Sequence, residues 1–167
     1  MRMRPYNKSQ DFEHIQKWVS DERTHALWCA KLLPYPFTSE DFHSFLAQGE
    51  KDWGDCGYIF MDDVGTPVGF CIVNINVAEN FGFVKFVVLD SELRGQGYGT
   101  RMMKLLLKYA YEIMGVGEVR INVFVCNIGA KKCYEKVGFT ERSFAENVLQ
   151  FGDECWGRYQ LAAEKMQ

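Results

Sequence analysis

The chain has 167 residues, 47% of them hydrophobic and 15% aromatic, which is enough for one substantial core, so we expect a single domain over residues 1–167. The net charge of −3, with acidic and basic residues interspersed, argues against a nucleic-acid surface. No apolar stretch has membrane-spanning length and no signal-peptide pattern is present, so we expect a cytoplasmic protein without membrane contact. The six cysteines form no C-x-x-C pair, and we expect no disulfide and no metal site.

Hydrophobic periodicity divides the first half of the chain into short elements. The expected elements are an edge strand within residues 1–7, a helix around 12–19, a short helix within 21–37, a capped helix after Thr38, and antiparallel strands at 58–61 and 68–77 around a turn at 63–66. The capped helix start is indicated by Thr38 followed by Asp41, because these side chains can satisfy the free N–H groups of a first turn.

A strand, a glycine turn and a helix follow in direct succession. Residues 83–89 are almost all β-branched or aromatic, which predicts a strand covered on both faces. Gly95, Gly97 and Gly99 come next, and alternating glycines let backbone N–H groups converge on an anion. The helix start adds free N–H donors and a positive dipole end, and Arg94 adds a planar cation. These features predict a turn that binds phosphate.

Spacing alone leaves a second interpretation of this turn open. A strand-to-helix connection can need glycine for its geometry only. Known nucleotide motifs fit poorly, because the glycines read G-x-G-x-G and no lysine followed by Ser or Thr completes a P-loop. A nucleotide-binding domain is therefore disfavoured.

A second strand–helix pair follows at residues 119–137. Alternating apolar residues predict a strand over 119–126, and Asn127 stands at the N-cap position of a helix. Gly138 is expected to end that helix in the left-handed conformation, and Phe139 to begin another strand. The tail after it, with Trp156 and Tyr159, is expected to add terminal strands.

Two sequence blocks resemble the GNAT superfamily of acyl-CoA-dependent N-acetyltransferases. The first block reads Arg94-Gly95-Gln96-Gly97-Tyr98-Gly99, and the second reads Asn127-x-x-Ala130-x-x-x-Tyr134-x-x-x-Gly138-Phe139. The resemblance implies an α+β fold with a mixed, mostly antiparallel central sheet flanked by helices. The implied order is strand, two helices, three strands, helix, strand, helix and two strands.

The resemblance also implies acetyl-CoA as cosubstrate and assigns residues to its site. The implied cofactor-binding residues are Val87, Val88, Leu89, Arg94, Gly95, Gln96, Gly97, Tyr98, Gly99, Thr100 and Asn127. In such enzymes the strand before the glycine turn splays from its neighbour, and a backbone N–H, here that of Leu89 or Val88, stabilises the oxyanion. Tyr134 matches the family's general acid, although helical spacing alone would make it a core aromatic.

The general base stays unassigned. Some relatives place a glutamate where this chain has Asn122, which cannot accept a proton at neutral pH. The other candidates are Asp21, Glu22, Asp90, Glu92, His25 and His43. Each is equally explained as a helix cap, a solvated charge or a packed side chain, and a water chain to solvent is also compatible with the family.

The acceptor implied by the resemblance is an amine, either a small molecule or a peptide N-terminus, which attacks directly in a ternary complex. Trp28, Tyr35 and Trp53 are candidates to wall its pocket, or ordinary core and rim aromatics. A second function stays open, a non-catalytic acyl-CoA-binding module of the same fold. Exposed edge strands in this fold are compatible with a homodimer.

Overall fold

The computed structural model describes residues 1–165. The elements in chain order are β1 (Arg2–Pro5), α1 (Phe12–Trp18), α2 (Glu22–Cys29), α3 (Ser39–Trp53), β2 (Cys56–Met61), β3 (Pro67–Asn76), β4 (Phe81–Leu89), a 3-10 turn (Ser91–Leu93), α4 (Tyr98–Glu112), β5 (Glu118–Phe124), α5 (Ile128–Lys136), β6 (Thr140–Phe151) and β7 (Glu154–Glu164). Three helices precede β2 rather than two, because the short helix expected within 21–37 is an element of its own, α2. None of the described helices is long and apolar enough to cross a membrane.

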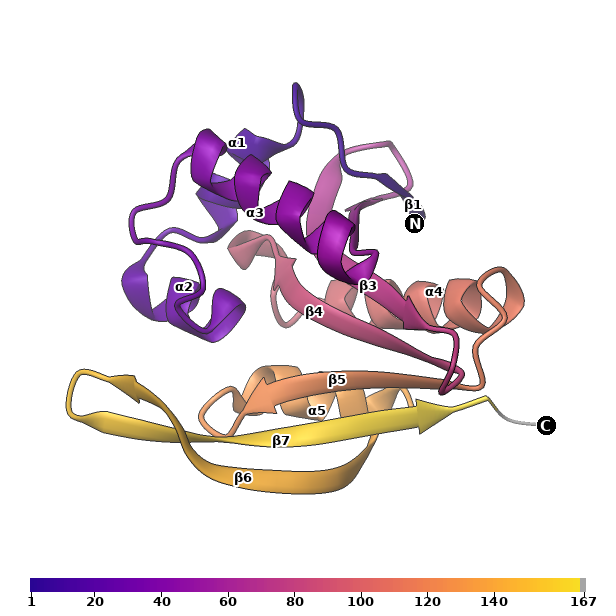
Figure 1. The fold of residues 1–167 in the computed structure, drawn as a ribbon. Helices are drawn as coiled ribbons and strands as arrows, with labels where there is room; N and C mark the ends of the chain where they lie inside the picture. The colour runs from indigo at the N-terminus through magenta and orange to yellow at the C-terminus, as the bar shows by residue number, and fades with distance from the viewer. Residues whose placement is uncertain (166–167) are drawn as a thin grey trace.

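One seven-stranded sheet organises the molecule, in the order β1-β2-β3-β4-β5-β7-β6. Every neighbouring pair is antiparallel except β4 and β5, which are parallel. Helices α1, α2 and α3 lie on one side of the sheet, and α4 and α5 lie on the other (Figure 1). The mixed, mostly antiparallel α+β fold predicted from the sequence is confirmed.

Strand β4 contains a bulge that changes the direction of its side chains. Phe70 pairs with Val88 and Ile72 with Lys85, so the single β3 residue between them faces two residues of β4. Phe86, one of those two, has a φ of 53°. As a result, Val84 packs in the core beneath α4, whereas Phe86 and Val88 both pack in the core beneath α1–α3.

Beyond the bulge, β4 and β5 separate. Their ladder runs only from Phe81–Val84 to Glu118–Ile121, and after it the two strands diverge toward α2 (Figure 1). The expectation that β4 is covered on both faces is therefore wrong in part, because its residues alternate between buried and partly buried. Val87 and Leu89 are among the partly buried ones, since both border the space that opens between the strands.

Local sequence signals fix the helix starts on either side of this opening. The Asp21 side chain accepts a hydrogen bond from the Thr24 N–H and caps α2. Thr38 and Asp41 form the predicted capping box of α3. Asn127 caps α5 by accepting from the Ala130 N–H, as its position in the sequence predicted. These caps hold α2 and α5 across the opening from one another.

Candidate active site

The glycine turn leaves its backbone open toward the space beside β4. Gly95 and Gly97 have φ values of 76° and 84°, a conformation that side-chain-bearing residues rarely adopt. No heavy atom lies within 4 Å of the position that a Cβ would take at either glycine. Helix α4 begins directly behind, and its N-cap, Gly97, offers no side-chain acceptor. The first N–H groups of α4 therefore stay available to an anion.

A large cavity of about 520 Å³ runs from this turn to the end of α2. Its lining comes from four places: α2 with Thr24, Leu27 and Trp28; β4 with Val87, Val88 and Leu89; the turn and α4 with Arg94, Gly95, Gly97, Gly99, Thr100, Met102 and Met103; and α5 with Asn127, Gly129, Ala130, Lys132, Cys133, Tyr134 and Lys136. Its volume is within the range of small-molecule sites, roughly 300–1,000 Å³.

The free backbone groups of β4 face this cavity. The Asp90 N–H donates to the Val68 carbonyl, and Val88 pairs with Phe70, so alternate residues of β4 direct their amides toward β3. By the same alternation, Val87 and Leu89 direct theirs away from β3, toward the diverging β5. Of the two oxyanion donors considered from the sequence, the Leu89 N–H has the suitable direction.

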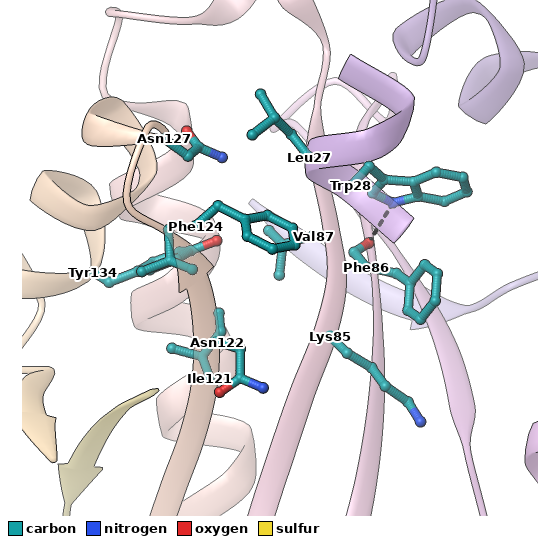
Figure 2. A pocket seen from close by; sticks show the side chains of 11 residues that line it. Leu27, Trp28, Lys85, Phe86, Val87, Ile121, Asn122, Phe124, Asn127 and Tyr134 are labelled. Atoms are coloured by element: carbon teal, nitrogen blue, oxygen red, sulfur yellow. Dashed lines mark hydrogen bonds between the residues drawn. The ribbon is translucent and has the colours of Figure 1, made fainter. Parts of the chain in front are cut away.

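Tyr134 reaches the cavity from α5 and is only 7% exposed. Its ring packs on Phe139 with the centroids 5.9 Å apart. Burial raises the pKa of the Tyr134 phenol, and the nearby Cys133 and Cys71 raise it further, so the hydroxyl keeps its proton. Within residues 1–165 this hydroxyl makes no hydrogen bond, and Figure 2 shows it directed into the gap between the strands. A protonated, unengaged phenol can act as a proton donor.

A second, smaller cavity of about 50 Å³ adjoins the first between β4 and β5 (Figure 2). Leu27, Trp28, Val87, Asn127 and Tyr134 line both cavities, and Lys85, Phe86, Ile121, Asn122, Val123 and Phe124 line only the smaller one. The Trp28 indole N–H donates to the Phe86 carbonyl at 2.8 Å and so joins α2 to the bulge of β4. The small cavity is therefore walled mainly by apolar and aromatic side chains.

Two polar side chains of the small cavity differ in how they are satisfied. Lys85 pairs with the buried carboxylate of Asp55 at 2.7 Å, and the amide of Asn74 also donates to Asp55 at 3.0 Å. Asn122, on β5, has an amide oxygen with no accessible surface and no hydrogen-bond partner in the described part of the chain. The cation of the small cavity is thus neutralised, and its amide oxygen is left without a donor.

The six candidate bases lie outside both cavities. Asp21 and Asp90 cap α2 and the 3-10 turn. His25 is buried against Cys29, and burial lowers the pKa of its imidazole, while His43 contacts the Tyr6 hydroxyl at 2.9 Å. Glu22 and Glu92 are also absent from the lining of both cavities. The structure thus brings none of these groups to the space beside Tyr134.

Most of the other residues singled out in the sequence meet at the large cavity, and four do not. Gln96 turns its amide to the Glu92 carbonyl, and Tyr98 lies outside the lining. Tyr35 and Trp53 are 42% and 69% exposed and border neither cavity, unlike Trp28. Sequence reasoning missed two basic side chains on α5, Lys132 and Lys136, although their spacing of four residues places them on one helix face.

These features supply the parts that acyl transfer requires: free backbone donors, a turn open to anions and a protonated phenol. Comparisons with known proteins agree with this class of site. A model of the acetyltransferase (GNAT) family matches residues 12–139. An uncharacterized N-acetyltransferase of Methanocaldococcus jannaschii is 25% identical over 101 residues, which make up 60% of this chain and 63% of that protein. The alignment therefore spans less than two thirds of that relative's length.

Solved structures with the same fold include two kinds of N-acetyltransferase. The spermidine N-acetyltransferase from Vibrio cholerae, in complex with CoA and spermine, superposes with a TM-score of 0.82 at 15% identity over 98% of this chain and 94% of that one. A putative phosphinothricin N-acetyltransferase superposes with a TM-score of 0.75 at 17% identity over 99% of both chains.

The chain belongs to the GNAT family of acetyltransferases, because the family model covers most of its length. The family predicted from the two sequence blocks is thereby confirmed. The structural likenesses, at such low identity, show the shared fold.

Proposed function

We propose that the protein is an acetyl-CoA-dependent N-acetyltransferase that moves the acetyl group to a primary amine by direct attack in a ternary complex. The observation that carries the proposal is the opening between β4 and β5, where the free amides of β4, the glycine turn and the Tyr134 phenol border one cavity. The residues fit a long ligand with phosphates at one end. Arg94 and the N–H groups from Gly95 to Thr100 would hold the pyrophosphate.

The chain's own groups account for the steps of transfer. The Leu89 N–H would donate to the carbonyl oxygen of the thioester and stabilise the negative charge that develops there. The amine nitrogen forms the new C–N bond as the C–S bond breaks. Tyr134 would give its proton to the departing sulfur, and the proton lost by the nitrogen would leave through water. The pantetheine arm would pair with the outward amides of Val87 and Leu89.

The acceptor is an amine in this proposal, either a small molecule or a peptide N-terminus. The named activities of the two solved relatives, toward spermidine and phosphinothricin, support an amine without choosing its structure. A single domain over residues 1–167 and a location in the cytoplasm remain predictions of the sequence, as does a homodimer.

Calorimetric titration with acetyl-CoA tests the donor site, and thiol release over a panel of amines and N-terminal peptides tests transfer. We expect saturable binding and amine-dependent release of CoA thiol. Adenosine 3′,5′-bisphosphate, which lacks the thioester, is the control ligand, and it should compete for binding without releasing thiol. Absence of acetyl-CoA binding would refute the proposal.

One observation favours a second function, an acyl-CoA-binding module without turnover. No carboxylate or histidine among residues 1–165 lines either cavity, so a dedicated general base is missing there. Binding of acetyl-CoA without thiol release for any amine would favour this function.

A further inference from the structure

The buried amide oxygen of Asn122 needs a hydrogen-bond donor that residues 1–165 do not supply. A buried polar atom without a partner costs roughly 1–3 kcal/mol, and most such atoms in proteins are satisfied. The oxygen borders a cavity of about 50 Å³, which has room for a small donor group. A ligand with an N–H or O–H group would therefore be favoured at this position.

The position of Asn122 ties that donor to acyl transfer. Asn122 lies on β5 across the gap from Lys85, and Figure 2 shows its amide on the side of the gap. Tyr134 borders both this cavity and the large one, so the small cavity adjoins the place where the thioester would lie. A nitrogen bonded to Asn122 would be close to the proposed proton donor.

The charges around the small cavity decide the form of the amine. An ammonium ion would need a carboxylate nearby, yet no carboxylate within residues 1–165 lines either cavity. The cation of the lining, Lys85, is already matched by Asp55. An uncharged amine requires no counter-charge and donates N–H to an amide oxygen.

The walls of the cavity point to an apolar group beside the nitrogen. Trp28, Phe86 and Phe124 surround Asn122 together with aliphatic side chains. A second ammonium close to the first would be buried among these side chains without compensation. The surroundings therefore suit a monoamine better than a polyamine.

We propose that this small cavity is the subsite of the acceptor nitrogen, where the Asn122 amide oxygen accepts a hydrogen bond from the uncharged amine of an apolar monoamine. The inference rests on the proposed N-acetyltransferase function and names the acceptor class for it. An amide cannot take up the proton of an ammonium ion, so the acceptor loses that proton to solvent before it binds. Its pKa, rather than that of an enzyme group, then sets the pH at which transfer begins.

The titratable groups near Asn122 are compatible with this pH dependence. From β4 comes Lys85, paired with Asp55, and from α5 comes Tyr134 with its raised pKa. On β5 the neighbouring Arg120 pairs with Glu118 and Glu79. Helix α2 contributes only Leu27 and Trp28 to the lining, and β7 places the neutral Gln160 opposite Asn122, with Arg158 one pair further along. None of these groups is a free carboxylate or imidazole.

The test compares Asn122→Leu and Asn122→Asp with the wild type. The acceptors are 2-phenylethylamine, its less basic β,β-difluoro analogue and spermidine. For the wild type, kcat/KM should be higher for 2-phenylethylamine than for spermidine. Its rise with pH should move to lower pH with the less basic analogue. Asn122→Leu should raise the KM of the amine at least about tenfold and leave the Kd of acetyl-CoA within about twofold, which also shows that the variant is folded.

Asn122→Asp separates binding from a purely structural role. The new carboxylate can take up a proton, so activity at low pH should increase and become less dependent on the basicity of the acceptor. Three results would each overturn the inference: an unchanged amine KM in Asn122→Leu, a wild-type pH midpoint that ignores the acceptor, or a preference for spermidine. If the wild type transfers acetyl to no amine, the proposed function fails and the inference falls with it. If it turns over and the variants behave alike, only the inference fails.

Discussion

At the residue scale, Tyr134 combines burial with a hydroxyl that nothing in residues 1–165 engages. Its raised pKa keeps the phenol protonated at neutral pH, which is the form required of a general acid. We predict that Tyr134→Phe lowers kcat about 100-fold or more, since general acid catalysis contributes about 10²–10⁴-fold. The Kd of acetyl-CoA should change little, because the ring contact with Phe139 is kept. Thiol release and calorimetry measure the two quantities.

Tyr111→Phe is the matched control. Tyr111 donates its hydroxyl hydrogen to the Ala163 carbonyl and lines neither cavity. Its loss should reduce stability slightly and leave kcat unchanged. Equal kcat values for Tyr134→Phe and the wild type would remove the acid role from Tyr134.

The hydrogen bond from the Trp28 indole to the Phe86 carbonyl leads to a stability prediction. Trp28→Phe leaves that buried carbonyl unpaired, at a cost of roughly 1–3 kcal/mol in addition to lost packing. Trp18→Phe is the control, because Trp18 is also buried but its indole N–H makes no hydrogen bond in the described chain. We expect a Tm lower for Trp28→Phe than for Trp18→Phe, by about 2–4 °C per kcal/mol. Equal Tm values would mean that the bond contributes nothing.

Single residues differed in how far the sequence could predict them. Arg94, Asn127 and Tyr134 belong to spaced blocks, and the structure does bring them to one cavity. The unpaired oxygen of Asn122 could not be predicted, because burial and partner geometry depend on strands that pair from distant parts of the chain. Lys132 looks like any solvated lysine until the neighbouring cavity is known.

At the element scale, the opening beside β4 depends on the bulge. Alternation predicted the strand and its direction into the glycine turn, but not the extra residue opposite β3. Bulges with a signal in sequence usually carry glycine, and here Phe86 takes the positive φ instead. The divergence of β5 likewise has no local signal, since residues 122–124 keep the pattern of a paired strand.

Another element, the edge strand β1, is tied to α1 through Asp11. Both Asp11 oxygens accept hydrogen bonds from Arg4 at 2.7 Å, and one also accepts from the Asn7 N–H at 2.7 Å. Burial alone would raise the pKa of Asp11, but these bonds and the Arg4 charge hold it below its ordinary value. We predict that Asp11→Asn lowers the free energy of unfolding by about 1.5–3 kcal/mol at pH 7.

The pH dependence of that difference follows from the lowered pKa. The contribution of Asp11 is fully present above its unfolded pKa of about 3.9 and is lost as the pH falls through the lower folded pKa. Urea unfolding at several pH values should show the wild type and Asp11→Asn converging below about pH 4. Glu112→Gln, on an exposed part of α4, should stay within about 0.5 kcal/mol of the wild type at neutral pH. A difference between Asp11→Asn and the wild type that persists unchanged at low pH would contradict this account.

At the scale of the whole molecule, charge is distributed against the net value. The chain carries a net charge of −3, yet the charged residues that line the large cavity, Arg94, Lys132 and Lys136, are all basic. Neither lysine forms an ion pair within residues 1–165. The overall composition could exclude a nucleic-acid surface but could not show this local cluster, because its members come from β4's turn and from α5. An anionic ligand would experience a positive field at the cavity while the rest of the surface repels it.

This field gives a prediction that depends on salt. Lys132→Gln and Lys136→Gln should each weaken acetyl-CoA binding several-fold at low ionic strength, and the loss should shrink at 1 M salt, where the Debye length is about 3 Å. Lys104→Gln removes the same charge from α4 outside the cavity lining, so the net charge of the protein changes equally in all three variants. If attraction came from net charge alone, the three variants would lose the same affinity at every salt concentration. Calorimetric Kd values at low and high salt distinguish these outcomes, and we expect Lys104→Gln to bind as the wild type does.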